Sequence, residues 1–328
     1  MFNSIILLIK LISIKLSIEG IKFSIRFFTL ISQFFNYAKI ILNTYFLSSL
    51  EKKFLNLKNN FKNFKSPKKK DFVEKNNKDL IVRDYSTWSN FNFRPILITT
   101  DHKSKRCQNT LDNLEKLDLK PDIFVGKTPK NITKFLIKSH ILSESKPVQI
   151  ACLISHLLTI KNALNNFDED IFLILEDDAI LFPNPSLVGL HEAVENKDWE
   201  VLQLEHHDAQ GIKRFINLYN KGILLHRWRR SDYGTSAYLI RRKFAERLIY
   251  YFFGKEDDMR IDLQKCYEFD EEIVADKIIY EAAQTLVFTF PLSYQDPNLP
   301  SLIGYNSRRM EERASATNLV EELWRKYI

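Results

Sequence analysis

Three consecutive carboxylates, Glu176-Asp177-Asp178, directly follow the fully apolar run FLIL at 172–175. A carboxylate at the end of a buried strand is held rigidly and faces the crevice where α/β sheets bind ligands. Crowded carboxylates repel one another unless a cation neutralises them, and their hard oxygens suit Mg²⁺ or Mn²⁺. Such a metal would carry the diphosphate of a nucleotide and absorb leaving-group charge. The triplet alone also fits an acidic turn, or the metal site of a phosphatase or a kinase.

The triplet stands in one of several blocks with chemistry-bearing residues along the chain. They are ILITTDHKSKRCQNTLDNLEKL (96–117), ACLISH (151–156), FLILEDDAIL (172–181), DWEVLQL (198–204) and YGTSAYLI (233–240), followed by Ala275-Asp276, Pro291 and Gln295. In this order, over about 94–304, they resemble glycosyltransferase family 25, which includes lipooligosaccharide and collagen galactosyltransferases. Ala151 stands where the family has glycine, and the first 70 residues lie outside the resemblance.

The resemblance implies an α/β fold of the GT-A, Rossmann-like type and an inverting sugar transfer. The expected donor is a UDP-sugar, with galactose or glucose favoured, and the expected acceptor is a hydroxyl of a glycan, a lipid-linked molecule or a protein. Mn²⁺ or Mg²⁺ is the expected cofactor. The alternative is a catalytically silent family member that acts as a membrane-tethered binding or scaffold protein.

The resemblance also implies roles for individual residues. The predicted metal ligands are Asp178, Glu176 and His206, with His207 as an alternative to His206. The predicted nucleotide-sugar contacts are Asp101, Arg106, Ser155, His156, Glu176 and Asp177. The predicted acceptor side is formed by Tyr233, Gly234 and Thr235. Inversion needs a general base. Asp276 and Asp232 are the candidates because both lie near matched blocks, and Asp276 is favoured. The competing interpretation of Asp276 is a helix-start carboxylate.

The elements that must position these residues follow from apolar periodicity. Strands are predicted over 96–100, 122–125, 171–175, 200–204 and 233–240. Helices are predicted over 106–117, 149–165, 242–251 and 308–328. Strands that alternate with helices predict a parallel-type sheet, with ligands beyond the carboxyl ends of its strands. The turns at Asp101 and Glu176 occupy that position.

The positive charge of the chain is concentrated at its N-terminus. The 328 residues carry 48 Lys and Arg against 41 Asp and Glu, a net charge of +7, but residues 1–70 alone contribute +11. The remaining residues therefore carry −4, which argues against a nucleic-acid-binding core and favours an anionic membrane as the partner of residues 1–70. With 45% hydrophobic and 27% charged residues, the chain is neither wholly disordered nor a polytopic membrane protein. Three scattered cysteines exclude a disulfide scaffold and indicate a reducing compartment.

Four segments are predicted along the chain. Residues 1–50 form an amphipathic, membrane-associating segment, 51–93 a lysine-rich linker, 94–305 the transferase domain and 306–328 a C-terminal helix. The longest uncharged run at the N-terminus, 27–38, is shorter than the roughly 20 residues that a spanning helix needs, so helices lying in the interface are favoured over a signal-anchor at 27–48. The expected location is the cytoplasmic face of a membrane. A type II membrane protein with a luminal domain is the alternative.

Overall fold

Apolar side chains alternate between the two faces of the central strands, and each face supports its own core. In β3 (Ile171–Glu176), Phe172 and Ile174 belong to one core while Leu173 and Leu175 belong to the other. The computed structural model describes residues 87–137, 147–196, 198–254, 259–270, 272–297, 299 and 307–327, with side chains from 311 onward in the last segment. The segment predicted for 1–50 and most of the 51–93 linker lie outside the described residues.

Among the described residues, the main sheet has seven strands in the order β2-β1-β3-β7-β5-β8-β6. Besides β3, they are β1 (Arg94–Thr99), β2 (Asp122–Val125), β5 (Val201–Gln203), β6 (Leu225–Arg227), β7 (Ala237–Arg241) and β8 (Thr285–Phe288). A smaller sheet pairs β4 (Ala179–Leu181) with β9 (Ser293–Gln295) in antiparallel orientation. The strands predicted at 96–100, 122–125, 171–175, 200–204 and 233–240 are therefore present, the last in a shorter form.

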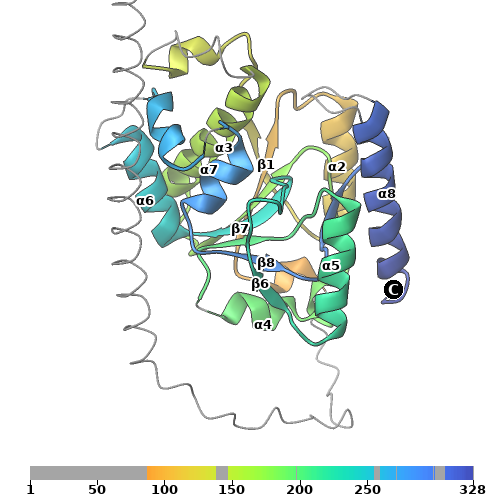
Figure 1. Ribbon diagram of the computed structural model, residues 1–328. Coiled ribbons are helices and arrows are strands. Elements are labelled where there is room, and N and C mark those ends of the chain that lie inside the picture. The colour runs from red at the N-terminus through yellow and green to blue at the C-terminus, as the bar shows by residue number, and fades with distance from the viewer. Residues whose placement is uncertain are drawn as a thin grey trace, which may run out of the picture. The chain divides into compact units, whose positions relative to one another are not determined.

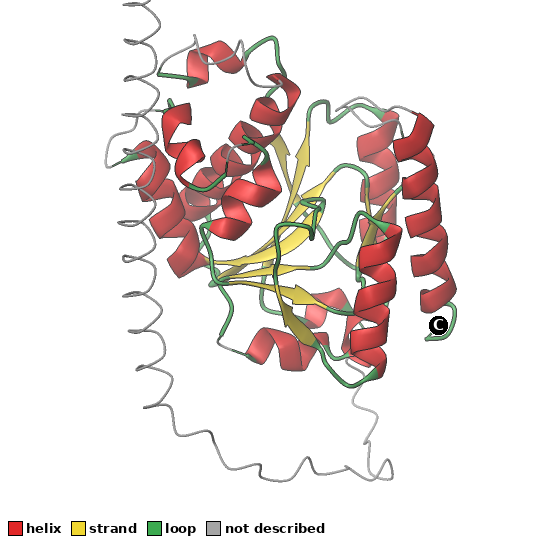
Figure 2. Ribbon diagram, in the orientation of Figure 1, coloured by secondary structure: helices red, strands yellow, loops and turns green. Residues whose placement is uncertain are grey.

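Helices cover both faces of this sheet, as Figure 2 shows. On one side lie α3 (Pro147–Asn166), α6 (Arg242–Phe253) and α7 (Ala275–Glu281); on the other lie α2 (Lys105–Glu115), α5 (Ala209–Asn220) and α8 (Ser307–Trp324) (Figure 1). The short α4 (Leu190–Glu195) packs into the same core as α2 and α8. Short 3-10 helices span Trp88–Asn90, Ile132–Phe135, Pro185–Val188 and Leu263–Glu268.

Local sequence explains where several helices begin and which of them are buried. The side chain of Ser104 accepts a hydrogen bond from the Cys107 amide at the start of α2, and Asp208 accepts one from the Gly211 amide at the start of α5. Helix α3 is apolar on most of its surface, and most of it is buried between the sheet and its neighbours. Within the described residues, α3 is the one helix long and apolar enough to cross a membrane, and 61% of its apolar window is buried inside the protein.

The expectation of a parallel-type sheet was wrong in one respect, because β7 runs antiparallel to both of its neighbours. It pairs with β3 and with β5 in antiparallel register, and β6 is antiparallel to β8. The start of β7 therefore lies beside the end of β3, and the Glu176 amide donates to the Ser236 carbonyl at 2.8 Å. This reversal brings the loop that precedes β7 to the edge where the acidic triplet lies.

Candidate functional site

A cavity of about 720 Å³ opens at the edge where β1 and β3 end and β7 begins. Ten of the thirteen predicted site residues line it: Arg106, Ser155, His156, Glu176, Asp177, Asp178, Tyr233, Gly234, Thr235 and Asp276. They come from β3, α2, α3, α7 and the loop before β7. The fold thus gathers blocks that are far apart in the sequence into one site.

The middle carboxylate of the triplet, Asp177, is buried and fully engaged. Thr99 at the end of β1 donates its hydroxyl to Asp177 Oδ2 at 2.6 Å, and Arg106 on α2 forms an ion pair with Oδ1. Thr110, one turn further along α2, donates to the Asp177 carbonyl at 2.8 Å. Asp177 therefore fastens α2 to the sheet and holds the Arg106 guanidinium at the cavity.

The third carboxylate, Asp178, lies between two arginines from opposite ends of the domain. Arg106 Nη2 is 2.8 Å and Arg313 Nη2 is 3.2 Å from Asp178 Oδ2. Burial raises the pKa of Asp178 to about 6. The two arginines act to lower this pKa, and the negative charge of Glu176 acts to raise it. Asp178 Oδ1 is buried and accepts no hydrogen bond from the described residues. This oxygen is available to a ligand.

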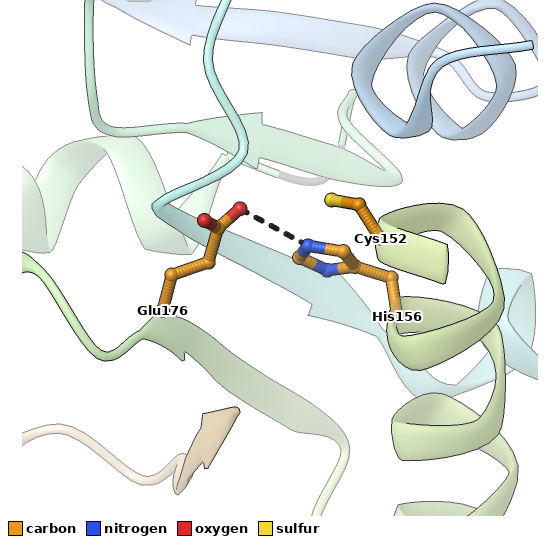
Figure 3. A group of neighbouring side chains, drawn as sticks. All are labelled: Cys152, His156 and Glu176. Carbon is orange, nitrogen blue, oxygen red and sulfur yellow. Dashed lines mark hydrogen bonds and ion pairs between the residues drawn. The ribbon is translucent and has the colours of Figure 1, made fainter. Parts of the chain in front are cut away.

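Glu176 joins a hydrogen-bonded cluster with residues of α3 and β7. Its Oε1 accepts from the Thr235 hydroxyl at 2.8 Å and lies 3.2 Å from His156 Nε2 (Figure 3). The other ring nitrogen of His156 lies 3.0 Å from the Tyr238 hydroxyl. Burial would raise the pKa of Glu176, but the hydrogen bonds and charge of its partners, His156 first, lower it to about 2. Glu176 is therefore an ionised carboxylate that positions the Thr235 loop.

We expect the substitution His156→Phe to change how stability depends on pH. Because the folded-state pKa of Glu176 is about 2 and its ordinary value is 4.5, this carboxylate stabilises the fold above about pH 4.5 and loses that contribution as the pH falls toward 2. Phenylalanine removes the partner that lowers this pKa most. The stability difference between wild type and variant, measured by urea unfolding, should therefore be larger at pH 6 than at pH 3.

A suitable control for that variant is His191→Phe, because His191 is half exposed and pairs with Glu195 on the surface. Its stability difference from wild type should be small at both pH values. Equal differences for His156→Phe at pH 6 and pH 3 would contradict the coupling between His156 and Glu176.

Asp276 faces the cavity from the first turn of α7 and is fixed by two backbone amides. Its Oδ2 accepts from the Gly234 amide at 3.2 Å, and its Oδ1 accepts from the Lys277 amide at 2.9 Å. Burial raises the pKa of Asp276, although these backbone hydrogen bonds act in the opposite direction. A carboxylate with a raised pKa in a cavity is suited to accept a proton.

A second pair of ionisable residues, Glu205 and His207, was not recognised as a unit from the sequence. His207 lines the cavity, and its Nδ1 lies 2.5 Å from Oε1 of the buried Glu205. Burial alone would lower the pKa of His207, but the charge of Glu205 and this hydrogen bond raise it to about 9. The cavity therefore holds an imidazolium in addition to its arginines.

Ser155 shapes the cavity wall through the backbone. Its hydroxyl donates to the Ala151 carbonyl at 2.7 Å and accepts from the Lys127 amide at 2.7 Å. This fixes the loop after β2, and Lys127 lines the cavity. A Cβ on Gly126 would lie 2.9 Å from Ser155 Oγ, so glycine permits the close approach. The predicted contact of Ser155 with a nucleotide stays a prediction.

Three predicted residues lie outside the cavity lining. Asp101 is exposed and accepts from the Lys103 amide in a turn. Asp232 is buried, forms an ion pair with Arg214 and accepts from the Arg229 amide. His206 is buried against Phe215, and its Nε2 bonds to the Phe288 carbonyl at 3.1 Å. These contacts give each of the three a local structural role.

The predicted metal ligands are not assembled as a set of three. Glu176 forms hydrogen bonds with His156 and Thr235. His206 lies outside the cavity lining, and burial, the main cause, lowers its pKa to about 3. Among the described residues that line the cavity, two buried oxygens have no hydrogen-bond partner, Asp178 Oδ1 and Gln295 Oε1. Gln295 pairs with Ala179, the residue after Asp178, and both Asp178 and Gln295 line the cavity. One carboxylate, a carbonyl oxygen and substrate phosphates suit Mg²⁺ or Mn²⁺.

A different group of ligand atoms lies next to this pair, formed by Cys152, His156 and Glu176 (Figure 3). Their ligand atoms all lie within 4.8 Å of one another. A thiol and an imidazole suit Zn²⁺ better than Mn²⁺ or Mg²⁺. Burial raises the pKa of the Cys152 thiol well above its usual range, so the thiol is protonated. This group is therefore a polar wall of the cavity, held by the His156–Glu176 hydrogen bond.

Arg313 and Gln295 line the cavity, but neither had a predicted role. Arg313 is 135 positions from Asp178 in the chain and stands in a helix whose pattern is simply charged and amphipathic. Gln295 belongs to a matched block, but only the β4–β9 pairing places it opposite Ala179, directly after the triplet. Lys127 and His207 had a weak signal, since each follows the end of a predicted strand.

Several solved structures are similar to this chain at low sequence identity. A197 from STIV shares 13% identity over 62% of this chain and 86% of that chain, with a TM-score of 0.35. The inositol-1-phosphate CTP transferase from T. maritima shares 11% identity over 69% of this chain and 97% of that chain, with a TM-score of 0.33. A glycosyltransferase involved in the glycosylation of the major capsid of PBCV-1 shares 7% identity over 68% of this chain and 98% of that chain, with a TM-score of 0.31. No curated protein matches the sequence significantly.

A protein-family match covers more than half of the chain. The family is described as glycosyltransferase family 25 (LPS biosynthesis protein), and the match spans residues 93–264. This span includes the acidic triplet, Arg106, His156 and the loop before β7, which the structure gathers at one cavity. The expected GT-A fold class is confirmed, with the correction that β7 and β6 reverse direction. The chain belongs to glycosyltransferase family 25.

Proposed function

We propose that this glycosyltransferase transfers galactose or glucose from a UDP-sugar to a hydroxyl acceptor with inversion at the anomeric carbon. The observation that carries the proposal is the composition of the cavity, in which a carboxylate with a raised pKa, Asp276, shares one space with cationic side chains. These are Arg106, Lys127, His207, Lys277 and Arg313. The carboxylate can accept a proton, and the cations can oppose the charge of a diphosphate.

In the proposed reaction, the acceptor hydroxyl attacks the anomeric carbon from the face opposite the diphosphate. The new oxygen–carbon bond forms as the bond from that carbon to the phosphate oxygen breaks, and the electron pair leaves with the nucleoside diphosphate. Asp276 takes the hydroxyl proton at its carboxylate, which the Gly234 and Lys277 amides hold in place. Arg106 and Arg313 at Asp178 keep positive charge beside the leaving group.

A divalent cation, Mn²⁺ or Mg²⁺, would be held by Asp178 Oδ1 and Gln295 Oε1 together with the phosphates of the donor. When bound, it would supply additional positive charge to the departing diphosphate. The proposed metal ligands are therefore Asp178 and Gln295, in place of the predicted Glu176 and His206.

The proposal is tested by incubating the protein with UDP-galactose and with UDP-glucose, each in Mn²⁺ and in EDTA. Water can replace the acceptor hydroxyl as the nucleophile, so slow release of UDP is the expected result. A silent scaffold protein would release no UDP and would show no thermal shift with any nucleotide sugar. That outcome would overturn the proposed activity in favour of the scaffold alternative.

We also propose that residues 1–70 bind an anionic membrane surface, with the transferase domain on the cytoplasmic face. The support is the net charge of +11 on a segment rich in Ile, Leu and Phe. The alternative remains a type II protein with a luminal domain.

Deletion of residues 1–70 should abolish binding to vesicles of phosphatidylcholine with about one-third phosphatidylserine. Both the lost apolar surface and the lost charge favour release, and binding of the full chain should weaken in high salt. Co-sedimentation measures both effects, with pure phosphatidylcholine vesicles as the control. Equal binding by the deleted and full-length chains would contradict the assignment.

A further inference from the structure

The C-terminal helix α8 is anchored to the domain by a continuous apolar face. Ala316, Val320, Leu323 and Trp324 are buried in the same core as β4 and α5. The Trp324 indole donates to the Pro291 carbonyl at 2.7 Å, and the Tyr294 hydroxyl on β9 lies 3.2 Å from Glu321 Oε1. The helix lies along the outer side of α2 and α5 (Figure 1). Its position relative to the cavity is therefore fixed by packing.

This anchoring delivers Arg313, two turns before the apolar end of α8, to the acidic triplet. Arg313 Nη2 donates to Asp178 Oδ2 at 3.2 Å and to the Asp296 carbonyl at 2.8 Å. Its side chain is only 11% exposed and lines the cavity. The family match ends at residue 264, so this arginine comes from a part of the chain outside the matched segment.

Two arginines compensate the charge of the triplet, and they pair with different carboxylates. Arg106 pairs with both Asp177 and Asp178, whereas Arg313 pairs with Asp178 alone. Without Arg313, the carboxylates would face a donor diphosphate with one more uncompensated negative charge. In a partly buried site such a charge acts strongly on a second anion a few ångströms away. A neutral nucleoside would not feel this repulsion.

On the basis of the proposed function, we infer that Arg313 is a positioning residue for the donor. It holds the Asp178 carboxylate and the turn at Asp296, and it compensates the charge of the triplet so that a nucleoside diphosphate can enter. The C-terminal helix is thus part of the donor site, and its effect is directed at the phosphates of the ligand.

The test compares the affinities of a nucleoside diphosphate and of its parent nucleoside in the full-length protein. The diphosphate is the one of UDP, GDP and CDP that the wild type binds best, and both affinities are measured by ligand-observed NMR in EDTA and in Mn²⁺. The variants are Arg313→Gln, Arg313→Lys and, as a matched control on the same helix, Arg325→Gln. Arg325 is exposed and pairs with Glu321 at 3.6 Å.

Arg313→Gln should weaken diphosphate binding by about tenfold or more while leaving nucleoside binding within about twofold of wild type. Arg313→Lys should restore most of the diphosphate affinity, because it keeps the charge, and it serves as the test variant if glutamine prevents folding. Arg325→Gln should bind both ligands as the wild type does. An equal loss for diphosphate and nucleoside, or no loss for either, would overturn the inference.

The same experiment separates the inference from the proposed function. If the wild type binds none of the three diphosphates in either condition, the proposed function fails and the inference fails with it. If the wild type binds UDP and Arg313→Gln binds it equally well, the proposed function is unaffected and only the role of Arg313 is wrong.

Discussion

Replacing Asp276 by asparagine is expected to lower the rate of sugar transfer by about 10²- to 10⁴-fold, the usual contribution of a general base. The amide matches the carboxylate in size but cannot take the acceptor proton. Nucleotide affinity should change little, because the cationic side chains of the cavity are retained. Steady-state kinetics on the variant, with the affinity for UDP measured separately, distinguish a loss in the chemical step from a loss of binding.

The pH dependence of the wild-type rate offers an independent check on this residue. Asp276 must be ionised to act, and burial raises its pKa above the ordinary value of 3.8. The acidic limb of the rate profile should therefore lie above pH 3.8, and activity should fall as the pH drops through the raised pKa of Asp276. Asp276→Asn should lack this limb.

The second candidate base, Asp232, provides the comparison. Because its carboxylate pairs with Arg214 and accepts the Arg229 amide, Asp232→Asn should lower stability by about 2 kcal/mol and the transfer rate only slightly. A variant Asp232→Asn without activity and with unchanged stability, beside an active Asp276→Asn, would move the base to Asp232.

Replacing Gly234 by alanine is expected to destabilise the fold by about 3 kcal/mol or more and to abolish activity. Gly234 has φ +131°, a backbone conformation that residues with a Cβ rarely adopt. An added Cβ would overlap Glu205 Oε2 and lie 2.8 Å from Glu205 Cδ. The same residue donates its amide to Asp276 and its carbonyl accepts from the Tyr280 hydroxyl at 2.7 Å. Any shift of the loop therefore displaces the proposed base.

Gly222→Ala is the matched control, because Gly222 has φ +77° and nothing lies within 4 Å of the added Cβ. It should cost about 1 kcal/mol from backbone strain alone and keep full activity. Urea unfolding and transfer assays on both variants separate the conformational effect from the steric one. A loss of stability at Gly234 no greater than at Gly222 would show that Glu205 moves aside freely.

The position of strands was largely predictable because apolar runs and turn residues are local signals. The runs at 94–99, 122–125 and 171–176 are strands in the structure, and the apolar helix over 147–166 is buried as its composition indicates. The acidic triplet falls at the end of β3, where the sequence placed it. These features depend on residues within a few positions of one another.

Strand direction was not predictable, since it depends on which neighbour a strand pairs with. The alternation of strands and helices favoured a parallel sheet, yet β7 inserts between β3 and β5 in the opposite direction. The pairing of Thr235 with Glu176 depends on that reversal, because a parallel β7 would place the loop before it at the other edge.

By itself, the sequence determined the family, the elements of the sheet, and the carboxylates and basic residues that could do chemistry. The tertiary structure alone decided which of them share a cavity. Asp232 forms an ion pair with Arg214, His206 is buried beside Phe215, and Arg313 contacts Asp178 from 135 positions away in the chain. The physical reason is that a buried charge is stable only beside an opposite charge, and the packing of the fold determines which residue supplies it. Which residue that is depends on the docking of whole helices, and local periodicity carries no record of it.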